Sequence, residues 1–342
     1  MKLRFYKYDL KLKHPFTIAR NTRTTSPTVI VEFEHEGIIG YGEAAPSNRY
    51  GETQETVYNI LANVNFCAFK NPPELKEILS YVNNFAPGNT AAKAAIDIAL
   101  HDWIGKYEKI PLWKKWGLDS HKIPVSSFTI GLDSPVVIET KIHEAEMFPI
   151  LKVKLGAKDD REIITRIRSI TNKTIRVDAN EGWKSKEEAL ENILWLENHN
   201  VELIEQPLPS SQIDEIKWLR QRVHIPLIAD ESVSRLIDIP QIVGAYDGIN
   251  IKLMKSSGLD EARKMIDLAK NNNLKIMLGC MIETSVAISA ASQLLPLADY
   301  ADLDGNILIS NDPFSGATSN NGLIELTEKY GIGVHKRQNY ML

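Results

Sequence analysis

Cysteine is almost absent from this chain of 342 residues, which contains only Cys67 and Cys280. The two are far apart in the sequence, and neither belongs to a Cys-X-X-Cys pair. A disulfide framework and a cysteine-ligated zinc site are therefore not expected, and the composition fits a reducing cytoplasm.

Long apolar runs and clusters of basic residues are also missing. No apolar core of signal-peptide length follows the first residues, and no uninterrupted run approaches the roughly 18 residues that span a bilayer. The formal net charge is −4. We therefore expect a cytoplasmic protein that binds no membrane and does not have nucleic acid as its main partner.

The first part of the chain predicts a lobe of antiparallel strands and helices. Residues 28–34 alternate polar and apolar side chains as a strand does, residues 36–37 suit a turn, and residues 38–42 continue as a second strand. Residues 90–106 are rich in alanine and have apolar side chains at helical spacing. We assign residues 1–118 to this α+β lobe.

From residue 123 onward, short apolar strands alternate with amphipathic helices. Strands are expected at Val125–Gly131, Ile150–Gly156, Ile175–Ala179, Val201–Glu205, Pro226–Asp230, Gly248–Leu253, Leu274–Gly279 and Tyr300–Gly305. Eight strands separated by seven helices are typical of a parallel barrel rather than an open sheet. We assign residues 123–314 to the barrel. Because this span is short for a complete barrel, an eighth helix is not expected, and residues 315–342 are expected to complete the first lobe.

Acidic residues stand at the ends of three successive expected strands. Asp178, Glu205 and Asp230 are 27 and 25 residues apart, one strand-helix unit each. Barrel enzymes carry their chemistry at the carboxyl ends of their strands, so the three carboxylates would converge. Crowded carboxylates repel unless a cation holds them, and an all-oxygen ligand set favours Mg²⁺, one ion per chain. The alternative is that each acid caps the helix that follows it.

Lysines flank these acids. Lys152 and Lys154 are two residues apart on one expected strand, so both point into the barrel if either does. A second ammonium and a nearby metal ion disfavour the charged form of Lys154 and make it usable as a base. Lys252 lies on the sixth strand, opposite the second, so the two lysines would approach a substrate from opposite faces, as inversion by proton transfer requires. The alternative for Lys252 is a solvated lysine at a strand end.

The order of these motifs resembles the enolase superfamily, and within it the muconate-lactonizing-enzyme-like subgroup, over nearly the whole chain. The matching segments are AKAAIDIALHDWIG at 92–105, KVK at 152–154, RVDAN at 176–180, IEQP at 204–207, ADES at 229–232 and NIKL at 250–253. The resemblance implies a (β/α)7β barrel, a modified TIM barrel, under an α+β capping domain. It also implies Mg²⁺ bound by Asp178, Glu205 and Asp230, with Lys154 and Lys252 as the acid/base pair.

Asp302 and Asp304 on the eighth strand resemble the paired aspartates with which dipeptide epimerases of this subgroup hold the ammonium group of their substrate. Two inward carboxylates need a cation, and an N-acylated substrate would leave them unpaired at appreciable cost. The resemblance therefore predicts an isomerase, a dipeptide epimerase that inverts the α-carbon of the C-terminal residue. Helix capping or pairing with a lysine is the alternative for the two aspartates.

In this family, loops of the capping lobe close over the substrate side chains, here roughly residues 15–27 and 44–53. Candidates that would meet an acidic side chain, such as that of Ala-Glu, or else be solvated charges, are Arg20, Arg23 and Arg49. Candidates that would suit a small or apolar side chain are Ile18, Thr24, Thr25 and Ser26. We expect a small first residue, Ala, and leave the second open between Glu and small or hydrophobic types.

On the barrel side, Lys152, Thr129 and Cys280 are expected at the substrate. Cys280 is expected to form part of the wall rather than to act as a nucleophile, because no His in the motifs stands ready to activate it. We also expect several identical chains to assemble.

Other functions remain open on the sequence alone. Within the same subgroup they are an N-acylamino acid racemase and an o-succinylbenzoate synthase. A barrel that binds without catalysing is a different class, but it would be expected to lose some of the five ionisable residues of the metal site and lysine pair, and all five are present. A phosphate-binding barrel enzyme would need a glycine-rich cradle after the last two strands, which the sequence lacks.

Overall fold

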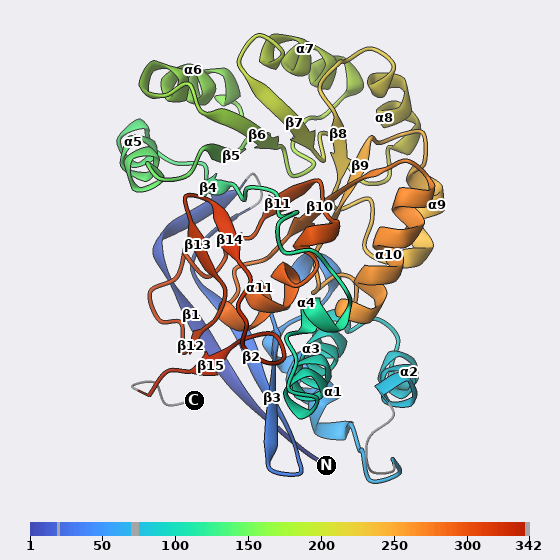
Figure 1. Ribbon diagram of the computed structural model, residues 1–342. Helices are drawn as coiled ribbons and strands as arrows, with labels where there is room; N and C mark the ends of the chain where they lie inside the picture. The colour runs from blue at the N-terminus through green and yellow to red at the C-terminus, as the bar shows by residue number, and fades with distance from the viewer. Residues whose placement is uncertain (19–20, 70–74, 339–342) are drawn as a thin grey trace.

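The computed structural model of the protein describes residues 1–18, 21–69 and 75–338. The chain begins with an antiparallel sheet of β1 (Lys2–Ile18), β2 (Asn21–His35) and β3 (Ile38–Ala44), in that order across the sheet. Helices α1 (Gln54–Asn63), α2 (Leu75–Phe85), α3 (Thr90–Tyr107) and α4 (Leu112–Lys115) follow (Figure 1). The strands expected at 28–34 and 38–42 and the helix expected at 90–106 are confirmed.

Helix α3 lies directly on β3 because two glycines of that strand have no side chain. A Cβ on Gly40 would come within 2.0 Å of the Ala99 carbonyl oxygen, and one on Gly42 within 1.9 Å of that of Ala95. The alanine-rich face of α3 and these glycines therefore allow backbone to approach backbone, which a larger residue at either strand position would prevent.

A parallel sheet of eight strands forms the second part of the described chain. The strands are β4 (Phe128–Ile130), β5 (Ile150–Lys154), β6 (Thr174–Asp178), β7 (Val201–Glu205), β8 (Leu227–Ala229), β9 (Gly248–Ile251), β10 (Lys275–Gly279) and β11 (Tyr300–Asp302), neighbours in that order. A parallel bridge between Ser126 and Ala301 joins the last strand to the segment before the first. The expected barrel of eight parallel strands is confirmed, and several observed strands end one to three residues earlier than expected.

Helices alternate with these strands on the outside of the ring (Figure 1). They are α5 (Pro135–Glu144), α6 (Asp160–Ile170), α7 (Lys186–Leu196), α8 (Ile213–Arg220), α9 (Ile239–Ile242), α10 (Leu259–Asn271) and α11 (Ser285–Ser292). In residues 303–338, which follow the last strand, the structure has no helix. The absence of an eighth helix agrees with the expectation from the length of the barrel segment.

The C-terminal segment contains the short strands β12 (Phe314–Ser315), β13 (Thr318–Asn320), β14 (Leu323–Glu325) and β15 (His335–Lys336). It also contacts the capping lobe. The Ile332 N–H donates to Asp102 Oδ1 of α3 at 3.0 Å, and Gly331 forms a bridge with Pro111. The division into residues 1–118 with 315–342 and residues 123–314 stays a prediction.

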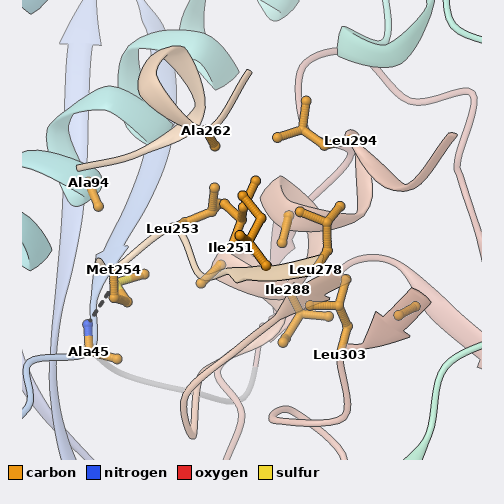
Figure 2. Close-up of a cluster of buried hydrophobic side chains, with 14 of the residues drawn as sticks. Ala45, Ala94, Ile251, Leu253, Met254, Ala262, Leu278, Ile288, Leu294 and Leu303 are labelled. Atoms are coloured by element: carbon orange, nitrogen blue, oxygen red, sulfur yellow. Dashed lines mark hydrogen bonds between the residues drawn. The ribbon is translucent and has the colours of Figure 1, made fainter. Parts of the chain in front are cut away.

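Capping lobe and barrel share one hydrophobic core. Figure 2 shows Ile251 and Leu278 of adjacent barrel strands in the same cluster as Ala94 of α3 and Met254. The Ala45 N–H, just after β3, points at the Met254 sulfur at 3.2 Å. The carboxyl ends of the barrel strands are thus packed against the capping lobe. No helix in the described ranges is long and apolar enough to cross a membrane.

Candidate active site

A cavity of about 890 Å³ lies where the carboxyl ends of the barrel strands meet the capping lobe. Its barrel wall includes Thr129, Lys152, Lys154, Asp230, Glu231, Lys252, Cys280, Asp302 and Asp304. Its capping-lobe wall includes Phe16, Arg23, Thr25, Arg49 and Tyr50. Charged groups from opposite sides of the ring and from both lobes therefore share one space, which is the usual position of a barrel active site.

Three carboxylates converge beneath this cavity. Asp178 and Glu205 are the last residues of β6 and β7, and Asp230 directly follows β8, the next strand in the ring. One oxygen of each carboxylate lies within 4.8 Å of the others, and all three side chains are buried. The three residues predicted as metal ligands are thus brought together.

The three carboxylates differ in how their surroundings shift the pKa, which is raised for Glu205 and lowered for Asp178 and Asp230. Burial raises the pKa of Glu205 to about 8, and the negative charge of Asp178 adds to the effect. Burial alone would also raise the pKa of Asp178, but the ammonium groups of Lys154 and Lys152 lower it below its usual value. An all-oxygen set of crowded carboxylates fits a hard divalent ion of the Mg²⁺ type.

Lys152 and Lys154 both reach the acid cluster from β5. Lys154 Nζ is 2.6 Å from Asp178 Oδ2. Lys152 Nζ is buried between three carboxylates, 2.7 Å from Glu205, 3.1 Å from Asp178 and 2.6 Å from Asp302. Both lysines face inward, as their spacing of two along a strand requires.

Lys252 approaches the cluster from the other side. It follows β9 directly, and its Nζ lies 2.7 Å from Asp230 Oδ2. In the ring order, β5 and β9 are four strands apart in either direction. Lys154 and Lys252 therefore come from opposite strands, with the three acidic strands along the arc between them. Burial alone would lower the pKa of Lys252, but the carboxylates of Asp230 and Glu205 raise it well above its usual value.

Asp302 and Asp304 differ in their surroundings. Asp302 pairs with Lys152 and accepts a hydrogen bond from Ser127 Oγ at 2.7 Å. Asp304 accepts one from the Thr129 N–H at 2.6 Å, and within the described ranges no Lys or Arg side chain forms an ion pair with it. Burial raises the pKa of Asp304 to about 6, with a further contribution from the Asp302 charge. Of the two aspartates, Asp302 is the one with an ion pair to a lysine among the residues that the structure describes.

Cys280 lies in the cavity wall, where its Sγ donates to the Asp302 carbonyl oxygen at 3.3 Å. Burial raises the pKa of this thiol well above its usual value, and the Asp304 carboxylate adds to the shift. A protonated thiol is a poor nucleophile, so the role of Cys280 as a wall residue stays the prediction.

The capping-lobe candidates separate into two groups. Arg23 is half-buried in the cavity wall, burial lowers its pKa, and it has no ion pair in the part of the chain that the structure describes. Arg49 instead pairs with Glu181. Of the remaining candidates, Thr25 lines the cavity, Thr24 is exposed and Ser26 is buried, whereas Arg20 and the side chain of Ile18 lie outside the described residues.

Comparison with known proteins matches both parts of the chain. Residues 2–117 match the model of the mandelate racemase / muconate lactonizing enzyme N-terminal domain, and residues 138–339 match the enolase C-terminal domain-like model. The chain belongs to the enolase superfamily. The resemblance inferred from the motifs is thereby confirmed.

Relatives of this superfamily member include an L-Ala-D/L-Glu epimerase of Bacteroides thetaiotaomicron, 52% identical over 98% of this chain and 88% of the relative. A dipeptide epimerase of Cytophaga hutchinsonii, solved with Mg and the dipeptide D-Ala-L-Val, superposes with a TM-score of 0.91 at 29% identity, covering 99% and 96% of the two chains. An N-succinyl Arg/Lys racemase of Bacillus cereus superposes with the same TM-score at 30% identity, covering 98% and 95%.

Lys255 is a further residue of this enolase-superfamily site, and no motif in the sequence predicts its place there. Its ammonium lies 2.6 Å from Asp230 Oδ1 and donates to the carbonyl oxygens of Asp230 and Val233 at 2.6 and 2.9 Å. The Asp230 carboxylate is therefore held through one oxygen by Lys255, while its other oxygen contacts Lys252. Lys255 follows β9 and also donates to the Asn250 carbonyl oxygen of that strand at 3.2 Å. Asp230 and Val233 lie beyond the end of β8, so only the tertiary fold brings them to Lys255.

Proposed function

We propose that the protein is a dipeptide epimerase that inverts the α-carbon of the C-terminal residue of a small dipeptide. The observation that carries the proposal is the placement of Lys154 and Lys252 on opposite strands of the ring, on either side of the acidic cluster. Two bases on opposite faces of a planar carbanion are what an inversion at carbon requires.

Asp178, Glu205 and Asp230 would hold Mg²⁺, in agreement with the Mg in the related dipeptide epimerase structure. When bound there, the ion stabilises the negative charge that develops on the substrate carboxylate as the α-proton leaves. One lysine accepts that proton at its Nζ, and the ammonium of the opposite lysine delivers a proton to the other face. The contacts of Lys255 keep the Asp230 carboxylate in place while this happens.

Asp304 favours a dipeptide over an N-acylated amino acid. A dipeptide carries a free ammonium group that would neutralise this buried carboxylate, whereas an N-succinyl group would bring a second negative charge to it. The overall fold does not separate the two functions, because dipeptide epimerases and an N-succinyl amino acid racemase superpose equally well. The charge balance at Asp304 therefore supports the epimerase, with the N-acylamino acid racemase and the o-succinylbenzoate synthase as alternatives.

Arg23 supports an acidic second residue. Its half-buried guanidinium lines the cavity without an ion pair in the described ranges, so a carboxylate on the substrate side chain would stabilise it. The relative from Bacteroides thetaiotaomicron is an L-Ala-D/L-Glu epimerase. We propose Ala-Glu as the preferred dipeptide. We further propose a cytoplasmic location and an assembly of identical chains, both of which remain predictions from the sequence and the family.

The test is incubation of a dipeptide library with the protein and Mg²⁺ in D₂O, read by mass spectrometry. Deuterium is expected at the α-carbon of the second residue, and N-succinyl amino acids in parallel incubations are expected to stay unlabelled. Lys154→Ala and Lys252→Ala are each expected to abolish epimerisation while calorimetry still detects Mg²⁺ binding. Retained inversion in either variant would contradict the two-base assignment, and labelling of the N-succinyl compounds alone would favour the racemase.

A further inference from the structure

A short turn of the capping lobe lies over the cavity. The 3-10 turn η1 (Asn48–Tyr50) is closed at its start by Ser47, whose side chain accepts from the Arg49 N–H at 3.3 Å. At its end the Gly51 N–H donates to the Asn48 carbonyl oxygen at 3.1 Å, with Gly51 at a φ of 72°. Residues 46–50 all line the cavity. This turn, residues 47–51, is thus a compact unit at the border of the two lobes.

One ion pair connects the turn to the barrel. Arg49 Nε and Nη2 donate to the two carboxylate oxygens of Glu181 at 3.1 and 2.9 Å, and Nη2 also lies 3.3 Å from Ser210 Oγ. Such a two-pronged contact fixes both the distance and the plane of the partners. The Glu181 side chain is only 13% exposed, so solvent screens the pair less than it screens an ordinary surface pair.

The barrel holds Glu181 in place independently of Arg49. The Ser210 N–H, from the loop after β7, donates to Glu181 Oε1 at 2.8 Å, and the Glu181 N–H donates to the Gln206 carbonyl oxygen at 2.9 Å. Burial alone would raise the pKa of Glu181, but the hydrogen bonds from Ser210 and Arg49 lower it, so the carboxylate is ionised. Glu181 follows Asp178 by three residues, so this anchor is part of the same strand end as the proposed metal site.

Tyr50, the residue after Arg49, is turned into the cavity. Its half-buried side chain lines the cavity, and Asp230, Lys252 and Glu231 are the barrel charges that act on its phenol. Burial raises the pKa of its phenol far above the usual value, and the Asp230 carboxylate adds to the shift, so the group is neutral. The turn therefore brings a large neutral ring to the Lys252 side of the site.

We propose that Arg49 is a positioning residue: through its ion pair with Glu181 it holds Tyr50 against the Lys252 side of the cavity. The ring then excludes water from that face while a proton passes between the substrate α-carbon and Lys252 Nζ. The inference rests on the proposed epimerase function. It assigns Arg49 to the closure of the site and leaves Arg23 to the substrate side chain.

The experiment uses two background variants, each of which keeps only one of the two lysines, and measures α-proton exchange in D₂O with Mg²⁺ present. In Lys154→Ala, only Lys252 remains, and it can exchange the α-proton of the epimer whose proton faces it. In Lys252→Ala, only Lys154 remains, and it can exchange the α-proton of the other epimer. Adding Arg49→Met is expected to slow exchange by about 10-fold or more in the first background, because small misplacements cost large factors in proton transfer. In the second background the exchange rate is expected to change by no more than about twofold, which is within the deviation that independent sites show.

Further variants separate positioning from general destabilisation. Glu181→Gln and Tyr50→Ala are expected to reproduce the selective loss, and Tyr50→Phe to retain exchange, because the ring and not the hydroxyl provides the shield. The matched control is Arg220→Met, since Arg220 forms a comparable pair with Asp247 at 2.9 Å and is 40% exposed against 39% for Arg49. This control is expected to leave both exchange rates unchanged.

The outcomes are distinct. Equal slowing in both backgrounds, or no slowing in either, overturns the positioning role even if epimerisation is confirmed. If the unmodified protein exchanges no dipeptide, the proposed function and this inference fall together. In an otherwise unmodified chain, Arg49→Met is expected to lower kcat about 10-fold while the Mg²⁺ dissociation constant measured by calorimetry is unchanged, and a weakened Mg²⁺ affinity instead would also contradict the proposal.

Discussion

At the scale of single residues, the presence or absence of an ion pair distinguishes side chains of the same type that the sequence alone does not separate. Arg23 lies on β2 and Arg49 in the turn η1, so both belong to the capping lobe, and both line the cavity. Arg49 is neutralised by Glu181, whereas Arg23 has no such partner in the part of the chain that is described. Likewise Asp302 forms an ion pair with Lys152, whereas Asp304 forms none within the described ranges. The proposed function assigns the member of each pair that has no ion pair, Arg23 or Asp304, to the charged groups of the substrate.

Arg23→Met is expected to lower kcat/KM for Ala-Glu by about 30-fold or more, because removing one partner of a buried charge pair costs about 2 kcal/mol or more. The value for Ala-Leu is expected to change by less than about threefold, since its side chain carries no charge for Arg23 to bind. Steady-state kinetics with both dipeptides provide the measurement, and Arg23→Lys, which keeps the charge but loses the planar fork, is expected to lie between. Equal losses for the two dipeptides would show that Arg23 serves the structure rather than substrate choice.

At the scale of elements, side chains of the capping lobe cap helices of the barrel. Asp97 of α3 is buried and accepts from the Leu259 N–H at 2.6 Å and the Asp260 N–H at 3.3 Å, at the start of α10. The residue before this helix is Gly258, with a φ of 113°, and a Cβ there would come within 2.4 Å of Asp97. Glu43 of β3 does the same for α11 through the N–H groups of Thr284 and Ala287. The same hydrogen bonds therefore cap the barrel helices and hold the two lobes together.

Asp97→Ala is expected to lower the free energy of unfolding by about 2–3 kcal/mol, because it removes a cap and leaves buried N–H groups unpaired. The matched control is Ser185→Ala, which removes the exposed cap that accepts from the Glu188 N–H at 3.1 Å at the start of α7. That change is expected to cost only about 1 kcal/mol. Denaturant unfolding of both variants gives the comparison, and equal costs would mean that burial between the lobes adds nothing to the cap.

At the scale of the whole molecule, two buried acids lie where the lobes meet. Burial raises the pKa of Glu43 to about 7, and burial with the nearby Glu43 charge raises that of Glu283 to about 8, both from a usual value of 4.5. Between pH 4.5 and these raised pKa values, the two carboxyl groups bind more protons in the folded protein than in the unfolded chain. The stabilisation from these two groups is complete below about pH 4.5 and is lost as the pH rises through about 7 to 8.

Glu283→Gln removes one of these titrations while its side-chain oxygen can still accept from the Met281 N–H, which lies 3.0 Å from Glu283 Oε1. The variant is therefore expected to gain stability relative to the parent protein as the pH rises from 5 to 8, by about 1 kcal/mol or more, since one pKa unit corresponds to 1.36 kcal/mol. Denaturant unfolding at several pH values with saturating Mg²⁺ measures the difference. A difference that stays constant with pH would contradict the raised pKa of Glu283.

The sequence by itself determined the ring of strands and the places of its chemistry. Strand and helix periodicity is local, and one carboxylate per strand-helix unit at Asp178, Glu205 and Asp230 is enough to make the three converge once a parallel ring is assumed. The same reasoning gave the inward direction of Lys152 and Lys154, because side chains two apart on a strand share a face. These features follow from the local periodicity of strands and helices and from the succession of strand-helix units along the chain.

Only the tertiary structure decided which charges are neutralised within the protein. The pairs Arg49–Glu181 and Lys152–Asp302 join residues more than a hundred positions apart, and Lys255 reaches Asp230 across two strand ends. No local pattern encodes such distances, because they depend on how the two lobes and the strand ends pack. The same packing left Arg23 and Asp304 without ion pairs among the described residues, which is why the proposed function assigns them to the substrate.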